Sequence, residues 1–135
     1  MTTLAAATSA IRARLAANWT TTAVAWPNEK FAAQETPWVA VEIRGSGEEQ
    51  LSIGAPGANL FRAAATLWLH VFVKRNTSDA TALAYAEQLA AIFRGQSFSG
   101  VLCQAASIYG GDEGSEDGKW WRRSVAVPFD FDATA

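Results

Sequence analysis

The sequence has little cysteine, little net charge and no long apolar run. Its single cysteine, Cys103, excludes a disulfide bond within the chain and fits a reducing, intracellular setting. A formal net charge of −2 and an isoelectric point near 5.3 disfavour a general nucleic-acid binder, which is usually basic. No apolar run reaches the roughly 18 residues that cross a membrane, and the first residues lack the pattern of a secretory signal. We therefore expect no membrane partner and no direct nucleic-acid recognition.

Recognisable catalytic motifs are also missing from the sequence. It contains no Walker loop, dinucleotide-binding fingerprint, nucleophile elbow or zinc-ligand spacing. The only histidine, His70, lies within a predicted strand. A Cys–His nucleophilic pair would need that ring to meet Cys103 in space, whereas alternation places the thiol toward the helices. We predict no catalytic residue, no metal site and no cofactor.

The most informative stretch that is present is residues 60–74, LFRAAATLWLHVFVK. Every odd position from Phe61 to Val73 is apolar, and this period of two predicts a strand. The even positions include Trp68 and Phe72, so the second face of the strand is partly apolar too. Because an antiparallel sheet normally keeps one face wet, we expect something to cover this second face.

The other patterns complete one domain over residues 1–135. The order is a helix over 2–18, strands over 21–26 and 37–44, an extended segment over 48–53, the strand at 60–74, a helix over 78–94, and strands over 101–108 and 119–131. We predict an α+β fold, with a mostly antiparallel β-sheet, two α-helices packed on one face and a long projecting β-hairpin.

Several details of these elements are predicted from single residues. Residues 45–47 break the second strand, residues 63–65 offer a bulge site, and Ser78 caps the second helix. Pro128 favours an edge strand because it lacks an N–H group. Residues 132–135 are expected to fray.

The projecting hairpin follows from length. Fifteen extended residues span roughly 50 Å, whereas a compact chain of this size is only about 37 Å across. We therefore expect residues 67–73 to hold the core and residues 60–65 to form one arm of a hairpin that reaches a neighbour.

Two charged or aromatic clusters are candidate contact sites. Residues 109–118 carry the acids Asp112, Glu113, Glu116 and Asp117, but these come as adjacent pairs between strands, unlike the alternating ligands of a calcium-binding loop. We interpret this stretch as a solvated hairpin tip and contact loop. Residues 120–123, WWRR, suit stacking on single-stranded nucleic acid, but the acidic composition favours a protein interface, where Trp and Arg are enriched.

Local stretches of the chain resemble a known family. Beyond the N-terminal helix, the matching stretches are residues 24–28, 37–41, 61–62, 67–73, 92–95, 118–121 and 127–129. Together they resemble the small tail-terminator, or tail-completion, proteins of long-tailed phages and gene transfer agents, which include the lambda-type minor tail protein. The resemblance implies a structural protein without catalytic residues.

The resemblance further implies a homo-oligomeric ring, typically a hexamer, in a phage or phage-like particle that is assembled in the host cytoplasm. The ring would cap the tail tube, stop its polymerisation and join the tail to the head connector, so its partners would be the tail tube protein and the head–tail connector protein. We hypothesise that the interface residues are Trp68, Phe72, Arg62, Trp120, Arg122, Asp112, Glu113, Glu116 and Asp117.

Two other classes of function stay open from the residues alone. One is a small ligand-binding or hot-dog-like enzyme domain, which would need a polar group such as His70 or a carboxylate at a buried pocket. The other is a monomeric cytosolic adaptor with one partner. A ring protein should self-associate in the absence of a ligand, which distinguishes it from both of these classes.

Overall fold

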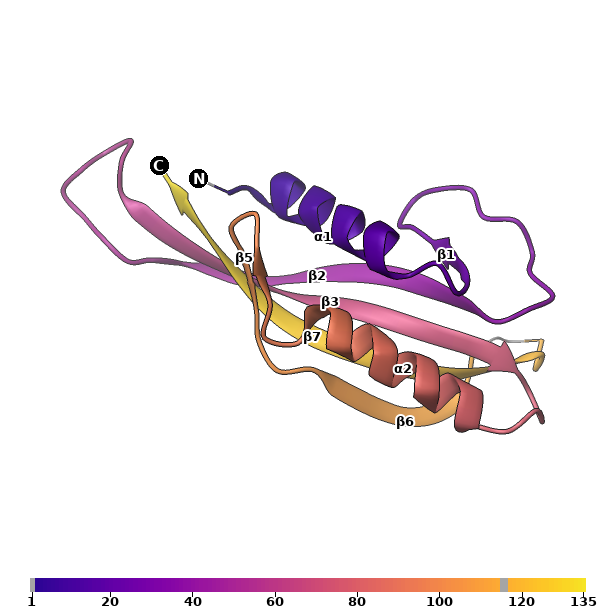
Figure 1. Ribbon diagram of the computed structural model, residues 1–135. Coiled ribbons are helices and arrows are strands. Elements are labelled where there is room, and N and C mark those ends of the chain that lie inside the picture. The colour runs from indigo at the N-terminus through magenta and orange to yellow at the C-terminus, as the bar shows by residue number, and fades with distance from the viewer. Residues whose placement is uncertain (1, 115–116) are drawn as a thin grey trace.

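The computed structural model describes residues 2–114 and 117–135 (Figure 1). The elements, in chain order, are α1 (Leu4–Asn18), β1 (Ala23–Ala25), β2 (Trp38–Gln50), β3 (Leu60–Lys74), α2 (Ala80–Phe93), β4 (Ser97–Phe98), β5 (Val101–Cys103), β6 (Ser107–Glu113) and β7 (Trp120–Thr134).

Within the described residues, seven strands form one curled sheet in the order β1-β2-β3-β7-β5-β4, and β6 also pairs with β7. Only the short β1 runs parallel to its neighbour β2; the remaining pairs are antiparallel. The long strands β2, β3 and β7 form the centre of the sheet. The predicted α+β fold with a mostly antiparallel sheet is therefore confirmed.

Both helices cover the same face of this sheet (Figure 1). Thr3 caps α1, because its hydroxyl oxygen accepts the Ala6 backbone N–H at 3.1 Å. The buried residues of α1 are Ala7, Ile11 and Leu15; those of α2 are Ala82, Ala86, Leu89, Ala90 and Phe93. They pack with the odd-numbered apolar side chains of β3, which are buried from Ala65 to Val73. The alternation of β3 thus set which face meets the helices.

The hairpin of β2 and β3 also forms where it was expected. Glu48 pairs with Ala63, and Gln50 pairs with Phe61. We had expected residues 45–47 to break the second strand, but β2 continues through them. Instead the register shifts there, because Gly45 faces Ala65 while Gly47 faces Ala64. Ser46 is therefore the extra residue of a bulge, which lies opposite the predicted site, on the other strand.

Residues 132–135 do not fray, so that prediction was wrong. β7 continues to Thr134 and pairs with the first residues of β3. Beyond it, Asn59 and Ala135 exchange two backbone hydrogen bonds of 2.9 Å. The hairpin arm is consequently a three-stranded structure at its base, and only residues 51–58 extend past it.

Pro128 lies in the central strand β7 and not at an edge, so that prediction was also wrong. It pairs with Thr66 of β3 on one side, and its carbonyl accepts the Gln104 N–H at 2.9 Å on the other. The N and C=O of one strand residue point the same way, so the missing N–H faces the gap between β5 and β6. A proline there costs β3 no hydrogen bond.

Two smaller predictions need correction. Asp79 holds the N-cap position of α2, but its side chain makes no capping hydrogen bond. Ser78 lies one position earlier, and its hydroxyl accepts the Ala80 N–H at 3.2 Å. The supposed acidic loop begins later than predicted, because β6 runs through Asp112 and Glu113.

Candidate functional site

The face of the sheet opposite the helices carries a polar and aromatic hollow at its centre. Its walls come from β2, β3, β6 and β7, and it encloses about 300 Å³. The lining side chains are Glu42, Arg44, Trp68, His70, Tyr109, Asp112, Arg122 and Ser124. The even positions of β2 and β3 supply half of these residues, as the register pairs Glu42 with Trp68.

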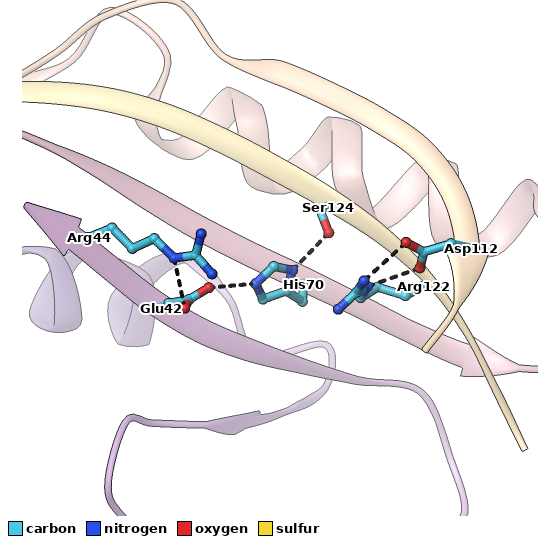
Figure 2. Close-up of polar contacts among 6 residues, drawn as sticks. All are labelled: Glu42, Arg44, His70, Asp112, Arg122 and Ser124. Atoms are coloured by element: carbon cyan, nitrogen blue, oxygen red, sulfur yellow. Dashed lines mark hydrogen bonds and ion pairs between the residues drawn. The ribbon is translucent and has the colours of Figure 1, made fainter. Parts of the chain in front are cut away.

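His70 occupies the middle of this hollow (Figure 2). Its Nδ1 lies 2.7 Å from the Ser124 hydroxyl oxygen, and its Nε2 lies 3.2 Å from a Glu42 carboxylate oxygen. Because an ionised carboxylate only accepts hydrogen bonds, a neutral His70 donates from Nε2 to Glu42 and accepts from Ser124 at Nδ1. Both ring nitrogens are therefore satisfied.

Glu42 is held as a carboxylate by its neighbours. Partial burial raises its pKa, but hydrogen bonds from His70 and Arg44 outweigh that effect and keep the pKa below its usual value. The Arg44 Nε lies 2.9 Å from the second Glu42 oxygen. On the other side of His70, the Arg122 guanidinium donates two hydrogen bonds of 3.0 Å to Asp112 (Figure 2).

The Ser124–His70–Glu42 chain is built into the paired strands of the sheet. Ser124 lies within β7, where its backbone pairs with His70 on one side and with Tyr109 on the other. The neighbouring backbone amides are therefore committed to the sheet, whereas an oxyanion site needs donors aimed at the reacting atom. Cys103 is remote from this chemistry: it is 2% exposed, and burial raises the pKa of its thiol to about 11. Among the described residues, no three His, Cys, Asp or Glu side chains gather as a metal site would require.

Trp68 is the aromatic centre of the hollow. Its ring lies 5.9 Å from that of His70 and 5.3 Å from that of Tyr109, measured between centroids, and Arg44 lies over it at 6.0 Å. Trp68 is half-buried, and Tyr109 is 50% exposed. This arrangement leaves aromatic surface open to a partner, surrounded by charged groups that already have partners.

A second concave site lies where β2 begins and β3 ends. It encloses about 640 Å³ and is lined by the aromatic side chains Phe31, Trp38 and Trp120, by the cations Lys74, Arg75 and Lys119, and by the carboxylates Glu35 and Asp117. Trp38 stacks on Phe72 at 4.1 Å and meets the edge of Trp120 at 6.0 Å. We call this site the aromatic pocket.

The hypothesised interface residues fall into distinct environments. Phe72 and Trp120 are only 6% and 9% exposed, so here the chain itself supplies the cover that we expected for the second face. Ion pairs join Arg62 to Asp132 at 2.9 Å and Arg75 to Glu113 at 2.8 Å. Asp117 accepts the Lys119 backbone N–H at 3.0 Å. Glu116 lies outside the described residues.

Comparison with known proteins gives the identity of the fold. The family model described as phage tail terminator protein matches residues 6–129. The chain belongs to this family. One solved structure superposes on the terminator chain with a TM-score of 0.68 at 18% sequence identity. The superposition covers 93% of this chain and 92% of the other, so the two share their fold over nearly their whole lengths. No curated protein matches the chain.

Membership of the terminator family has three consequences. The family is a structural one, which implies a non-enzymatic protein. It also implies a place in the tail of the virion and partners within that tail.

In the described residues, no helix has the length and apolar character that crossing a membrane demands.

Sequence reasoning missed part of both sites. It identified Trp68, Asp112 and Arg122 in the hollow and Trp120 and Asp117 in the aromatic pocket, but not Phe31, Trp38 or Tyr109. Trp38 carried a usable signal, because alternation places it on the same face of β2 as Glu42. Phe31 carried none, since residues 26–37 contain no regular strand or helix.

Proposed function

We propose that this terminator protein assembles into a homo-oligomeric ring, typically a hexamer, that caps the tail tube and stops its polymerisation. The ring then joins the tail to the head connector. The family match over residues 6–129 is the observation that carries this proposal. The partners are accordingly a second copy of the chain, the tail tube protein and the head–tail connector protein.

The open sheet face supplies a surface suited to such contacts. A binding hot spot usually has an aromatic anchor near its centre, surrounded by contacts that contribute little energy themselves but exclude water from the anchor. Trp68 is that anchor, and Arg44, Asp112 and Arg122 form the rim. Arg62, Glu113 and Asp117 extend the proposed contact surface. Phe72 and Trp120 lie on the same face but are almost fully buried.

The test is an elongation assay with purified tail tube protein. Added during polymerisation, the chain should shorten the tubes in proportion to its concentration. The Trp68→Ala variant should keep its circular dichroism spectrum but lose most of this effect, because a central tryptophan contributes at least about 2 kcal/mol at a hot spot.

Trp26 provides a matched control outside the proposed surface. It is also half-buried and lies under an arginine, with the Arg12 guanidinium 4.5 Å from its ring. Trp26→Ala should therefore arrest elongation as the wild type does. Tubes that keep growing at a molar excess of wild-type chain would overturn the proposed function.

A further inference from the structure

The two ends of the long sheet differ in chemistry. Figure 1 shows the loop between β2 and β3 at one end and the loop that precedes β2 at the other. The end with the loop between β2 and β3 carries residues 51–58, which we call the arm tip. The opposite end carries the aromatic pocket. Roughly 45 Å of extended β3 separates the two.

The arm tip exposes apolar side chains. Ile53 is 87% exposed and Leu51 is 41% exposed, although both are large and apolar. Between Arg44 and Arg62 the only charged residues are Glu48 and Glu49, just before the tip. The tip thus presents an apolar end with a negative base.

Hydrogen bonds hold the arm tip in one shape. The Leu51 N–H donates to the Leu60 carbonyl at 2.7 Å, and the Leu60 N–H donates to the Ser52 hydroxyl at 2.7 Å. The buried Asn59 accepts the Ala55 N–H through its side chain at 3.1 Å. A segment already ordered in this way loses little conformational freedom when it binds.

The aromatic pocket is complementary to this tip. Phe31, Trp38 and Trp120 give it apolar walls. Two of its cations already have carboxylate partners, since Lys74 pairs with Glu35 at 3.3 Å and Arg75 pairs with Glu113 at 2.8 Å. The Trp38 indole N–H is buried and has no acceptor among the described residues.

We infer that the arm tip of one copy docks in the aromatic pocket of the next. Ile53 and Leu51 enter the pocket between its aromatic walls. Two different surfaces at opposite ends of one subunit make a head-to-tail contact. Such a contact forms a ring when the rotation between successive copies adds up to a full turn. This inference rests on the proposed ring and names the contact that builds it.

Site-directed disulfide formation tests this contact. The exposed Ala32 lines the pocket, and the native Cys103 is too buried to compete, with a thiol pKa of about 11. Under mild oxidation, a mixture of the Ile53→Cys and Ala32→Cys variants should give a disulfide-linked dimer. The dimer should form both in solution at high protein concentration and when the variants are bound to tail tubes. The double variant should give a ladder that stops at the ring's subunit number.

The controls distinguish this contact from others. Ile53→Cys alone should not dimerise, and it should not cross-link to Ser9→Cys, on the exposed surface of α1. A dimer of Ile53→Cys alone would mean a two-fold, tip-to-tip contact and would overturn the inference. Equal cross-linking to Ser9→Cys would overturn it as well.

An equilibrium measurement supplies a second readout. Ile53→Asp should weaken self-association roughly 30-fold, because burial of an isoleucine contributes about 2 kcal/mol, with an unchanged circular dichroism spectrum. Leu102→Asp, at another exposed apolar residue, should associate as the wild type does.

The two proposals fail differently. Wild-type rings on tubes without the Ile53–Ala32 cross-link would overturn the arm contact and leave the terminator role intact. Cross-linked rings that do not bind tubes would support the arm contact and overturn the terminator role.

Discussion

Two aromatic residues on one face of β3 should respond very differently to truncation. Phe72 is 6% exposed, stacks on Trp38 at 4.1 Å, and abuts Gly114, where an added Cβ would lie 2.7 Å from the Phe72 ring. Phe→Ala changes at buried sites cost about 3–5 kcal/mol. We expect Phe72→Ala to lower the free energy of unfolding by about 3–4 kcal/mol, toward the lower end because the site lies near the rim of the pocket.

Trp68 lies four residues earlier and is only half-buried. Its contacts are the rings of His70 and Tyr109, and the latter is itself 50% exposed. Its ring is more exposed than that of Phe72, so its removal sacrifices a smaller share of its burial. We expect Trp68→Ala to cost about 1–2 kcal/mol, within the range of ordinary substitutions.

Urea denaturation followed by far-ultraviolet circular dichroism measures both values. The protein concentration should be one at which light scattering finds monomers, because association would add to the apparent stability. The dependence of the unfolding free energy on urea should be unchanged, so that the midpoints report stability directly. Equal costs for the two variants, or a larger cost for Trp68→Ala, would refute the division between a buried support and an open contact residue.

Three further predictions concern the rest of the fold. Gly111→Ala should cost about 1–3 kcal/mol in thermal or urea unfolding, because its Cβ would lie 2.0 Å from the Trp121 ring; an unchanged stability would contradict this packing. Cys103 should react with a thiol reagent at pH 8 only as fast as the core opens, since its pKa is raised to about 11 by burial, and rapid labelling of the native chain would argue against that burial. Asp79→Asn should cost on the order of 1 kcal/mol, because Asp79 accepts hydrogen bonds from Arg123 and from Trp121, which hold its pKa below its ordinary value of 3.8. A depressed native pKa stabilises the fold at pH values above the pKa of the unfolded chain. The difference in unfolding free energy between wild type and Asp79→Asn should therefore be constant above about pH 5 and shrink as the pH falls; a difference that grows in acid would contradict this role of Asp79.

Alternation predicted the centre of the fold well because one constraint dominates there. Leu67, Leu69, Val71 and Val73 can only be buried together on one face, and a slip of one residue would expose all of them. The same pattern in β7 places Val125, Val127 and Phe129 against the helices. The first helix begins at Leu4, two residues after the predicted start, with Thr3 as its cap.

The sequence misled where a residue's usual preference was offset by a distant partner. Residues 110–111 looked like a loop because they are glycines, yet β6 continues through them, and a side chain at Gly111 would collide with the Trp121 ring. Pro128 fits a central strand because its missing N–H faces the gap between β5 and β6. Neither partner can be inferred from local sequence.

The candidate sites were predictable only in part for the same reason. The even positions of β3 gave Trp68 and Phe72, but which of them is exposed depends on Trp38 and on the loop that holds Phe31. The arm was predicted from strand length alone. Its buttress, the pairing of residues 60–62 with residues 132–134, came from a segment that was expected to fray.

Electron microscopy of tail tubes mixed with the chain tests the central claim most directly. The account predicts a ring of discrete subunit number at one end of each tube, with no density added along the tube wall. Tubes whose ends are unchanged at saturating chain, or a chain bound along the wall, would contradict it.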